Sequence, residues 1–197
     1  MDDAIIPALV SFAFAATITP GPNNIMVMAS GANFGFRRSI QHLLGISVGV
    51  LPIILLAGVG LMTIFEAVPE LETMLRVVST GYLLWLSWKI ASAAPPKTGD
   101  AAGKPLSFFQ AAAFQWVNPK VWATGLSATA LFAPEGGLIS VVLVALTFAI
   151  IGLAANAVWA WMGTMLQHWL MVGRRLPLFN IAMAVLLVVS LYPAWRH

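Results

Sequence analysis

Two short motifs have the residue types needed to build a binding site for a small solute inside a membrane. They are TPGPNN at residues 19–24 and NPK at residues 118–120, and both lie within otherwise apolar stretches. Proline lacks a backbone N–H and its ring clashes with the preceding turn, so each motif is expected to break or kink a helix. Backbone groups freed in this way at membrane depth persist only where protein or a wet cavity satisfies them.

The order of residues in each motif predicts where the broken helix resumes. Asparagine is a good N-cap and proline is favoured at the first helical position, so Asn118 is expected to cap a helix that begins at Pro119. In the first motif Thr19 or Gly21 would be the cap, with the next proline following. Two helix N-termini, with free N–H groups and partial positive charge, would then meet near the bilayer middle and suit an anionic group such as a carboxylate.

Lys120 lies thirteen residues into the apolar stretch 108–132. A charge at that depth costs roughly 2.5 kcal/mol or more, which makes Lys120 a candidate for a substrate or coupling role. Its alternative role is to cap carbonyls freed by a break. Asn23 and Asn24 can offer amide oxygens to an ammonium group or amide N–H groups to a carboxylate, or they can satisfy the broken backbone.

Asn156 and Gln115 are weaker candidates, because interhelical hydrogen bonding usually explains such residues. No catalytic residue and no metal ligand is predicted. The predicted substrate-binding residues are Pro20, Gly21, Pro22, Asn23, Asn24, Asn118, Pro119, Lys120 and Asn156.

The composition indicates an integral membrane protein. The chain has 197 residues, of which 60% are hydrophobic and 9% charged, and its mean hydropathy is +0.90. Soluble domains carry roughly 25% charged residues. Six spans of about 20 apolar residues are predicted. They are residues 5–32 and 108–132, each interrupted by a motif, and residues 43–65, 73–92, 138–165 and 176–195.

Residues 93–105 have the composition of a linker and divide the chain into halves, 1–92 and 106–197. Each half begins with an interrupted span, and Pro20 and Pro119 are 99 positions apart. Three spans per half require opposite orientations. The predicted fold is therefore an all-α membrane protein with six transmembrane helices, arranged as two inverted three-helix repeats with broken first and fourth helices. The alternative is a coincidence among twelve prolines.

The charges predict an orientation. If six spans cross the membrane, one face collects seven basic residues, which are Arg37, Arg38, Lys89, Lys97, Lys104, Arg174 and Arg175. The positive-inside rule makes that face cytoplasmic and places both termini in the periplasm. Because the positive charge is sorted to one membrane face, it does not indicate nucleic-acid binding.

Residue types that the spans lack narrow the function. No Asp or Glu falls within a predicted span and the chain has no cysteine, so carriage of a metal ion is disfavoured. A fully cationic substrate would also lack a counter-charge in the bilayer. A zwitterion fits better, with its carboxylate on the helix N-termini and Lys120 and its ammonium on carbonyl and amide oxygens. No enzyme site and no cofactor are expected.

The N-terminal part of the chain contains the first motif, Gly31, the segment GFRR at 35–38 and the glycines at 45 and 49. With these residues it resembles the first two spans of the lysine exporter (LysE/RhtB) family of amino-acid efflux permeases. The NPK motif is similar to that family's second signature. The resemblance covers essentially the whole chain. The chain departs from it at Ser39-Ile40, where a small residue and glycine usually follow the basic pair.

The resemblance implies a bacterial inner-membrane exporter of amino acids or close derivatives that is driven by the proton motive force. Its partners would be a small-molecule substrate, the lipid bilayer and protons as the coupling ion, and a homo-oligomer is compatible with it. The leading hypothesis is export by alternating access around a site built from the two breaks. The alternative is a membrane scaffold that binds a partner subunit.

Overall fold

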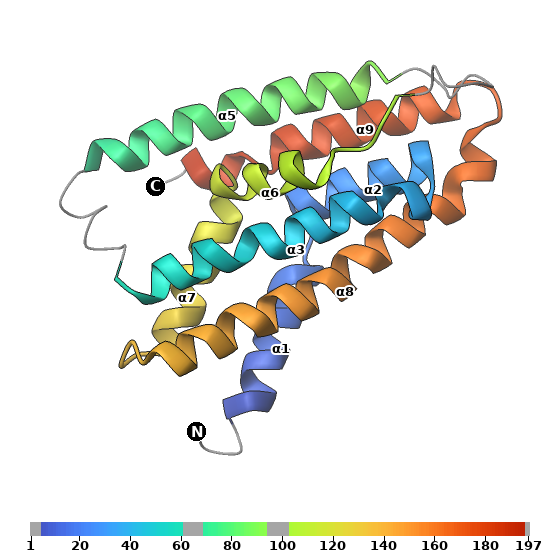
Figure 1. The fold of residues 1–197 in the computed structure, drawn as a ribbon. Coiled ribbons are helices and arrows are strands. Elements are labelled where there is room, and N and C mark those ends of the chain that lie inside the picture. The colour runs from blue at the N-terminus through green and yellow to red at the C-terminus, as the bar shows by residue number, and fades with distance from the viewer. Residues whose placement is uncertain (1–4, 61–68, 94–102, 196–197) are drawn as a thin grey trace.

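The computed structural model describes residues 5–60, 69–93 and 103–195, and these residues form helices and connecting segments without a strand (Figure 1). The helices are α1 (Ile5–Ile18), α2 (Pro22–Phe34), α3 (Phe36–Gly58), α5 (Pro69–Ala91), α6 (Phe108–Trp116), α7 (Pro119–Phe132), α8 (Leu138–Leu170) and α9 (Arg175–Val189), followed by the 3-10 turn Tyr192–Trp195.

The first motif breaks its helix as predicted. The axes of α1 and α2 meet at an angle of 60°. Gly21 is the N-cap of α2 in an extended conformation, and Pro22 occupies the first helical position. Of the two predicted caps, Gly21 is therefore correct and Thr19 is wrong. The Thr19 hydroxyl instead donates to the Ala15 carbonyl one turn earlier, at 2.6 Å.

The second motif also behaves as predicted. Helix α6 ends at Trp116, Asn118 is the N-cap of α7, and Pro119 is its first residue. The Asn118 side-chain oxygen accepts a hydrogen bond from the Lys120 backbone N–H at 3.2 Å. The second break therefore arises from chemistry that is local to three consecutive residues.

Two of the described helices, α3 and α8, are long and apolar enough to cross a membrane, and the bent pair α1–α2 is a third candidate span. The other three predicted spans coincide with α5, with α6 and α7 together, and with the shorter apolar helix α9, so their crossing stays a prediction.

The second span was predicted to begin at Leu43, but α3 begins at Phe36. Gly35 has a positive φ of 80°, which lets one residue end α2 and start α3. Residues 61–65 and 94–102 lie outside the described residues.

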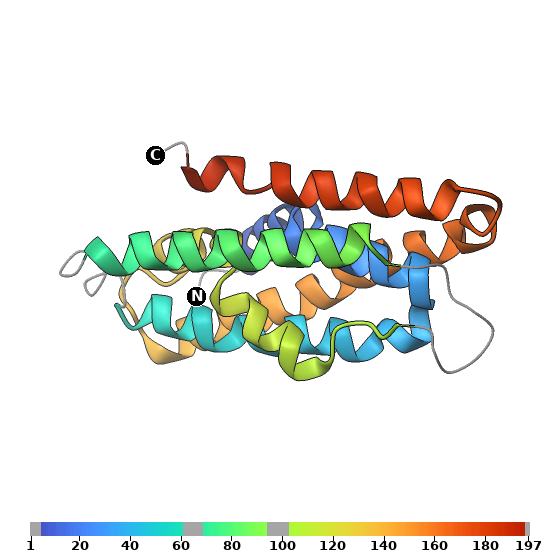
Figure 2. The same ribbon diagram turned by 90° about the horizontal axis from the view of Figure 1, so that it is seen from above.

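The two halves of the chain interlock. Helix α8 packs along α1 and α2, whereas α3 packs along α6 and α7. The unbroken helix α3 of the first half thus lies against the broken helix α6–α7 of the second half. In the same way, the unbroken helix α8 of the second half lies against the broken helix α1–α2 of the first half. Helices α3 and α8 contact each other, as do α5 and α9 (Figure 1 and Figure 2). This reciprocal pairing supports the predicted inverted repeat with halves 1–92 and 106–197, which stays a prediction.

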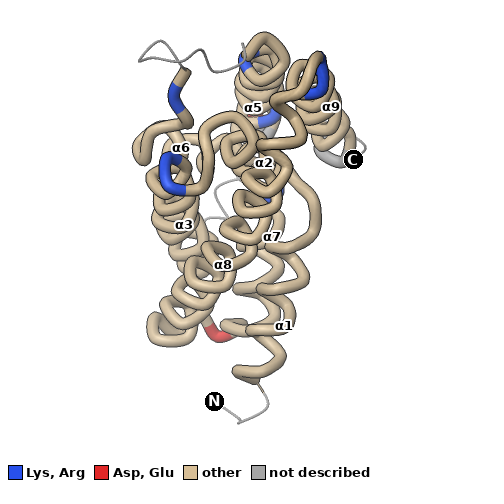
Figure 3. The backbone as a smooth tube through the Cα atoms, turned by 90° about the vertical axis from the view of Figure 1, so that its right-hand side faces the viewer, with Lys and Arg blue, Asp and Glu red and all other residues tan. Residues whose placement is uncertain are grey.

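Basic residues gather at one end of the molecule. The start of α3, the end of α5 and the start of α9 lie together there, and Figure 3 views the chain from this end. They carry Arg37 and Arg38, Lys89, and Arg175 respectively. Glu135 lies in the α7–α8 connection at the opposite end. Described residues of the predicted basic face therefore gather at one end of the fold, whereas Lys97 lies outside the described residues.

Glycines allow the closest helix contacts. A Cβ added to Gly31 would clash with the Ala160 carbonyl oxygen, and one added to Gly163 would clash with the Met28 carbonyl oxygen, so α2 and α8 meet backbone to backbone. Gly45 and Gly49 let α3 approach α6 in the same way. Small residues at such positions are typical of membrane helix packing.

We expect Gly31→Ala to destabilise the protein by about 1–3 kcal/mol, because α2 and α8 must separate to admit the methyl group. Gly81→Ala is the matched control, since a Cβ at this helical glycine of α5 meets nothing within 4 Å. The free energy of unfolding in a detergent-denaturant titration measures both. Equal stability of the two variants would contradict the close α2–α8 contact.

Candidate substrate site at the helix breaks

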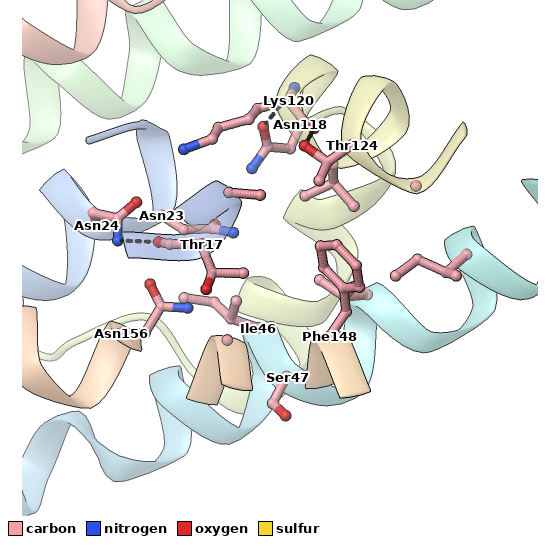
Figure 4. A pocket seen from close by; sticks show the side chains of 16 residues that line it. Thr17, Asn23, Asn24, Ile46, Ser47, Asn118, Lys120, Thr124, Phe148 and Asn156 are labelled. Atoms are coloured by element: carbon pink, nitrogen blue, oxygen red, sulfur yellow. Dashed lines mark hydrogen bonds between the residues drawn. The ribbon is translucent and has the colours of Figure 1, made fainter. Parts of the chain in front are cut away.

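A cavity lies where the two helix breaks meet (Figure 4). Side chains from α1, α2, α3, α7 and α8 line it. Its volume is about 60 Å³. This central cavity is therefore on the scale of a small polar solute.

Five of the nine predicted substrate-binding residues line the central cavity, namely Asn23, Asn24, Asn118, Lys120 and Asn156. The other four do not line it. Pro20, Gly21, Pro22 and Pro119 shape the breaks that bring the five together. A direct binding role for any of the nine stays a prediction.

Lys120 joins the two breaks. Its ammonium donates to the Thr19 carbonyl oxygen at 2.6 Å, just beyond the end of α1. Its chain lies against Gly21, where an added Cβ would be 2.8 Å from Lys120 Cδ and 3.0 Å from Nζ. The C-terminal end of a helix carries partial negative charge, which a cation stabilises. Lys120 thus has the capping role that the sequence left open, and its two remaining ammonium donors have no partner among the described residues.

Two other side chains hold the end of α1. The Asn24 amide donates to the Thr17 carbonyl oxygen at 2.9 Å, and the Trp159 indole N–H donates to the Ile18 carbonyl oxygen at 3.1 Å. With Lys120, these donors come from α2, α8 and α7. The carbonyls at the end of α1 are therefore satisfied by three different helices.

A reciprocal amide pair connects the two breaks a second time. The Asn23 amide N–H donates to Gln115 Oε1 at 2.8 Å, and the Gln115 amide N–H donates back to Asn23 Oδ1 at 3.1 Å. Gln115 also donates to the Ala111 carbonyl oxygen within α6, at 2.9 Å. Half of the Asn23 side chain's hydrogen-bonding capacity, one donor and one acceptor position, is thus used in joining α2 to α6.

The two helix N-termini differ in a way that the sequence did not predict. At the start of α7, the Asn118 side chain accepts from Lys120 N–H, and its carbonyl accepts from Val121 N–H at 3.0 Å and Trp122 N–H at 3.4 Å. At the start of α2 the cap is a glycine without a side chain. Among the residues that the structure describes, the backbone N–H groups of Asn23 and Asn24 have no acceptor. Free donors therefore remain at α2 and not at α7.

Asn156 is the unpaired polar group of the central cavity. Its side chain is 5% exposed, and its Oδ1 has no hydrogen-bond partner in the described part of the chain. An unsatisfied buried polar group costs about 1–3 kcal/mol. Figure 4 shows Asn156 across the cavity from Lys120. A ligand with a donor at one end and an acid group at the other would meet partners on both sides.

Hydroxyl groups of Thr17, Ser47 and Thr124 also line the cavity, although the sequence did not single them out. Thr124 follows Lys120 by one helical turn, so helical periodicity could have indicated it. Thr17 precedes the first motif by two residues, a spacing that does not place side chains on one face of a helix, so periodicity would not have indicated it. Ser47 joins them only because α3 packs against α8, where its hydroxyl donates to the Ala149 carbonyl oxygen at 2.7 Å.

Known proteins resemble this chain along almost its full length. The family model described as LysE type translocator matches residues 14–191. The chain belongs to the LysE type translocator family. This translocator is therefore a membrane transport protein rather than an enzyme, as predicted.

Curated relatives of this translocator agree with the family. The cysteine/O-acetylserine efflux proteins of Escherichia coli (strain K12) and of Shigella flexneri are each 35% identical to it over 191 residues, which is 95% of this chain and 96% of theirs. The protein of the same name from Escherichia coli O139:H28 is 34% identical over the same length. No solved structure matches the chain. The predicted resemblance to amino-acid efflux permeases is confirmed.

The contact between Gly21 and Lys120 can be tested by Gly21→Ser. Serine is a good N-cap and the extended backbone accepts it, but its Cβ would displace Lys120 from the Thr19 carbonyl oxygen. We expect a loss of about 0.5–1.5 kcal/mol in the free energy of unfolding. In a Lys120→Ala background the same change should cost little. A double-mutant cycle measures this coupling, and additive effects would show that the two residues act independently.

Proposed function

We propose that this translocator exports small zwitterionic amino acids or their derivatives, of the cysteine and O-acetylserine class, out of the bacterial cytoplasm. The observation that carries the proposal is the division of unpaired groups in the central cavity. Lys120 and Asn156 lie across the cavity from each other, and the Oδ1 of Asn156 is unpaired among the described residues. The N–H groups of Asn23 and Asn24 at the start of α2 have no acceptor among these residues.

The substrate carboxylate would bind at the first break. Lys120 supplies a cation, and the N–H groups of Asn23 and Asn24 supply two donors at the positive end of a helix. A substrate carboxylate would compete with the Thr19 carbonyl oxygen for the Lys120 ammonium. Binding would therefore loosen one of the bonds that fix α1.

The substrate ammonium would bind to Asn156. None of the described residues that line the central cavity is Asp or Glu, so a substrate with net positive charge would find no counter-charge among them. A zwitterion brings its own counter-charge and needs only the neutral oxygen of Asn156 for its amine. Phe148 and Ile54 give the cavity an apolar wall that suits a short side chain.

The proposed transport mechanism is alternating access, in which one half of the chain rocks against the other around the central cavity. Two links between the halves would change during each cycle. They are the Lys120 bond to Thr19 and the amide pair of Asn23 with Gln115. The resemblance to the permease family suggests protons as the coupling ion. The basic end would face the cytoplasm of the inner membrane and both termini would face the periplasm.

Counterflow in proteoliposomes tests the substrate site. We expect the wild-type protein to exchange labelled O-acetylserine. Lys120→Ala and Asn156→Leu should each lower the exchange rate at least tenfold, because each removes a group that binds one end of the zwitterion. Ser127→Ala is the matched control, since this exposed hydroxyl of α7 bonds only to its own helix, at Ala123.

Wild-type exchange rates in both the Lys120 and Asn156 variants would refute the proposed site. Faster exchange of lysine than of O-acetylserine by the wild-type protein would refute the preference for zwitterions.

Alternating access predicts that the central cavity opens to each side of the membrane in turn. The chain has no cysteine, so Thr124→Cys introduces a single thiol into the cavity. A membrane-impermeant methanethiosulfonate should react with it from either side, and saturating O-acetylserine should slow that reaction several-fold. Labelling from one side only, under every condition, would contradict the mechanism.

A further inference from the structure

A second cavity lies at the basic end of the molecule, between α2, α3, α5 and the segment that precedes α6. About 100 Å³ of it is open to the centres of water molecules. Lys89 and Lys104 are on its wall, and none of the described residues that line it is acidic. We call it the basic-end cavity. Its charge favours an anionic ligand.

A buried histidine lines this cavity and has an unused hydrogen-bonding group. His42 is 1% exposed, and its Nδ1 is 3.0 Å from the Ser30 hydroxyl oxygen. Its Nε2 is buried and has no partner among the described residues. When the Ser30 hydroxyl donates to Nδ1, the proton of the neutral ring is on Nε2, which can then donate to an anion. The positive-inside rule accounts for the two lysines at this end of the molecule, but it does not account for an unpaired imidazole nitrogen.

The basic-end cavity and the central cavity follow one another along the same two helices. On α3, His42 lines the basic-end cavity, and Ile46, one turn later, lines the central cavity. On α2, Asn24 lines the central cavity and Ser30 lines the basic-end cavity. Six residues of helix separate them, which is about 9 Å. The two cavities are therefore neighbours along α2 and α3.

We propose that the basic-end cavity binds the carboxylate of a small amino-acid solute before the solute reaches the central cavity. This inference rests on the proposed function for its direction, from the basic end inward. Lys89 and Lys104 attract the carboxylate at the mouth, and His42 Nε2–H binds one of its oxygens at the floor. The site holds only the acid group, so it recruits amino acids generally and leaves selection to the central cavity.

Nitrogen-15 NMR of histidine side chains tests this in phosphatidylcholine nanodiscs. The chain has three histidines, and His42→Gln assigns the signal. O-acetylserine is the probe, and we expect it to shift the His42 Nε2 resonance in a saturable way. The double variant Lys89→Gln/Lys104→Gln should weaken this response at least tenfold. Arg37→Gln/Arg174→Gln is the control, because it removes the same charge from the same end without altering the cavity lining.

Transport supplies the second measurement. Transport is measured in vesicles with O-acetylserine supplied on the side of the membrane that the basic end faces. There the Lys89/Lys104 double variant should raise the half-saturating concentration of O-acetylserine at least fivefold and leave the maximal rate unchanged. A fall in the maximal rate alone, with the half-saturating concentration unchanged, would assign the two lysines a structural role and overturn the proposal.

The Lys120→Ala variant separates this inference from the proposed function. The His42 response should persist in that variant even though exchange is lost. If Lys120→Ala and Asn156→Leu both exchange at the wild-type rate, the central site is refuted while the His42 response still reports on the basic-end cavity. A His42 response that disappears with Lys120 would show an effect transmitted from the central cavity. A response to phosphatidylglycerol in the nanodiscs but not to O-acetylserine would identify a lipid site. Either result overturns the proposal.

Discussion

The carbonyl groups at the end of α1 have lost their helical partners inside an apolar bundle, and much of the central cavity is built to supply replacements. Asn24, Trp159 and Lys120 each donate to one of the last residues before the first break. An unpaired carbonyl in a low-dielectric environment is costly. The break at Pro20 to Gly21 is therefore stable only because α2, α7 and α8 converge on it.

This requirement explains why structural and binding roles coincide. A group that satisfies freed backbone must be polar, must reach the bilayer interior, and must come from a neighbouring helix. The same properties suit a group that binds a polar solute. Lys120 caps α1 with one of its three donors, whereas Asn23 uses half of its hydrogen-bonding positions on Gln115. The ligand site proposed above is therefore based on which groups are left unused, rather than on residue type.

The sequence predicted the parts of the structure that depend on neighbouring residues. Helix capping by asparagine and helix initiation by proline depend on neighbouring residues alone. The cap at Asn118 and the start of α7 at Pro119 could therefore be predicted from the three residues of the NPK motif. The sequence did not predict the partner of Asn23, because Gln115 is 92 positions away and reaches it only through packing. It also predicted free donors at both helix N-termini. Asn118 turned out to satisfy its own helix, so only the glycine-capped α2 keeps them.

The two links that are proposed to change during transport differ in charge, and this has an electrical consequence. Opening the amide pair of Asn23 and Gln115 moves no net charge, so the membrane voltage does not bias it. Lys120 carries a full charge when protonated, and moving one elementary charge across the whole membrane is worth about 2.3 kcal/mol per 100 mV. Any step that shifts Lys120 along the bilayer normal would therefore be favoured or opposed by the resting potential. Of the two links, the Lys120 bond is thus the one that depends on membrane voltage.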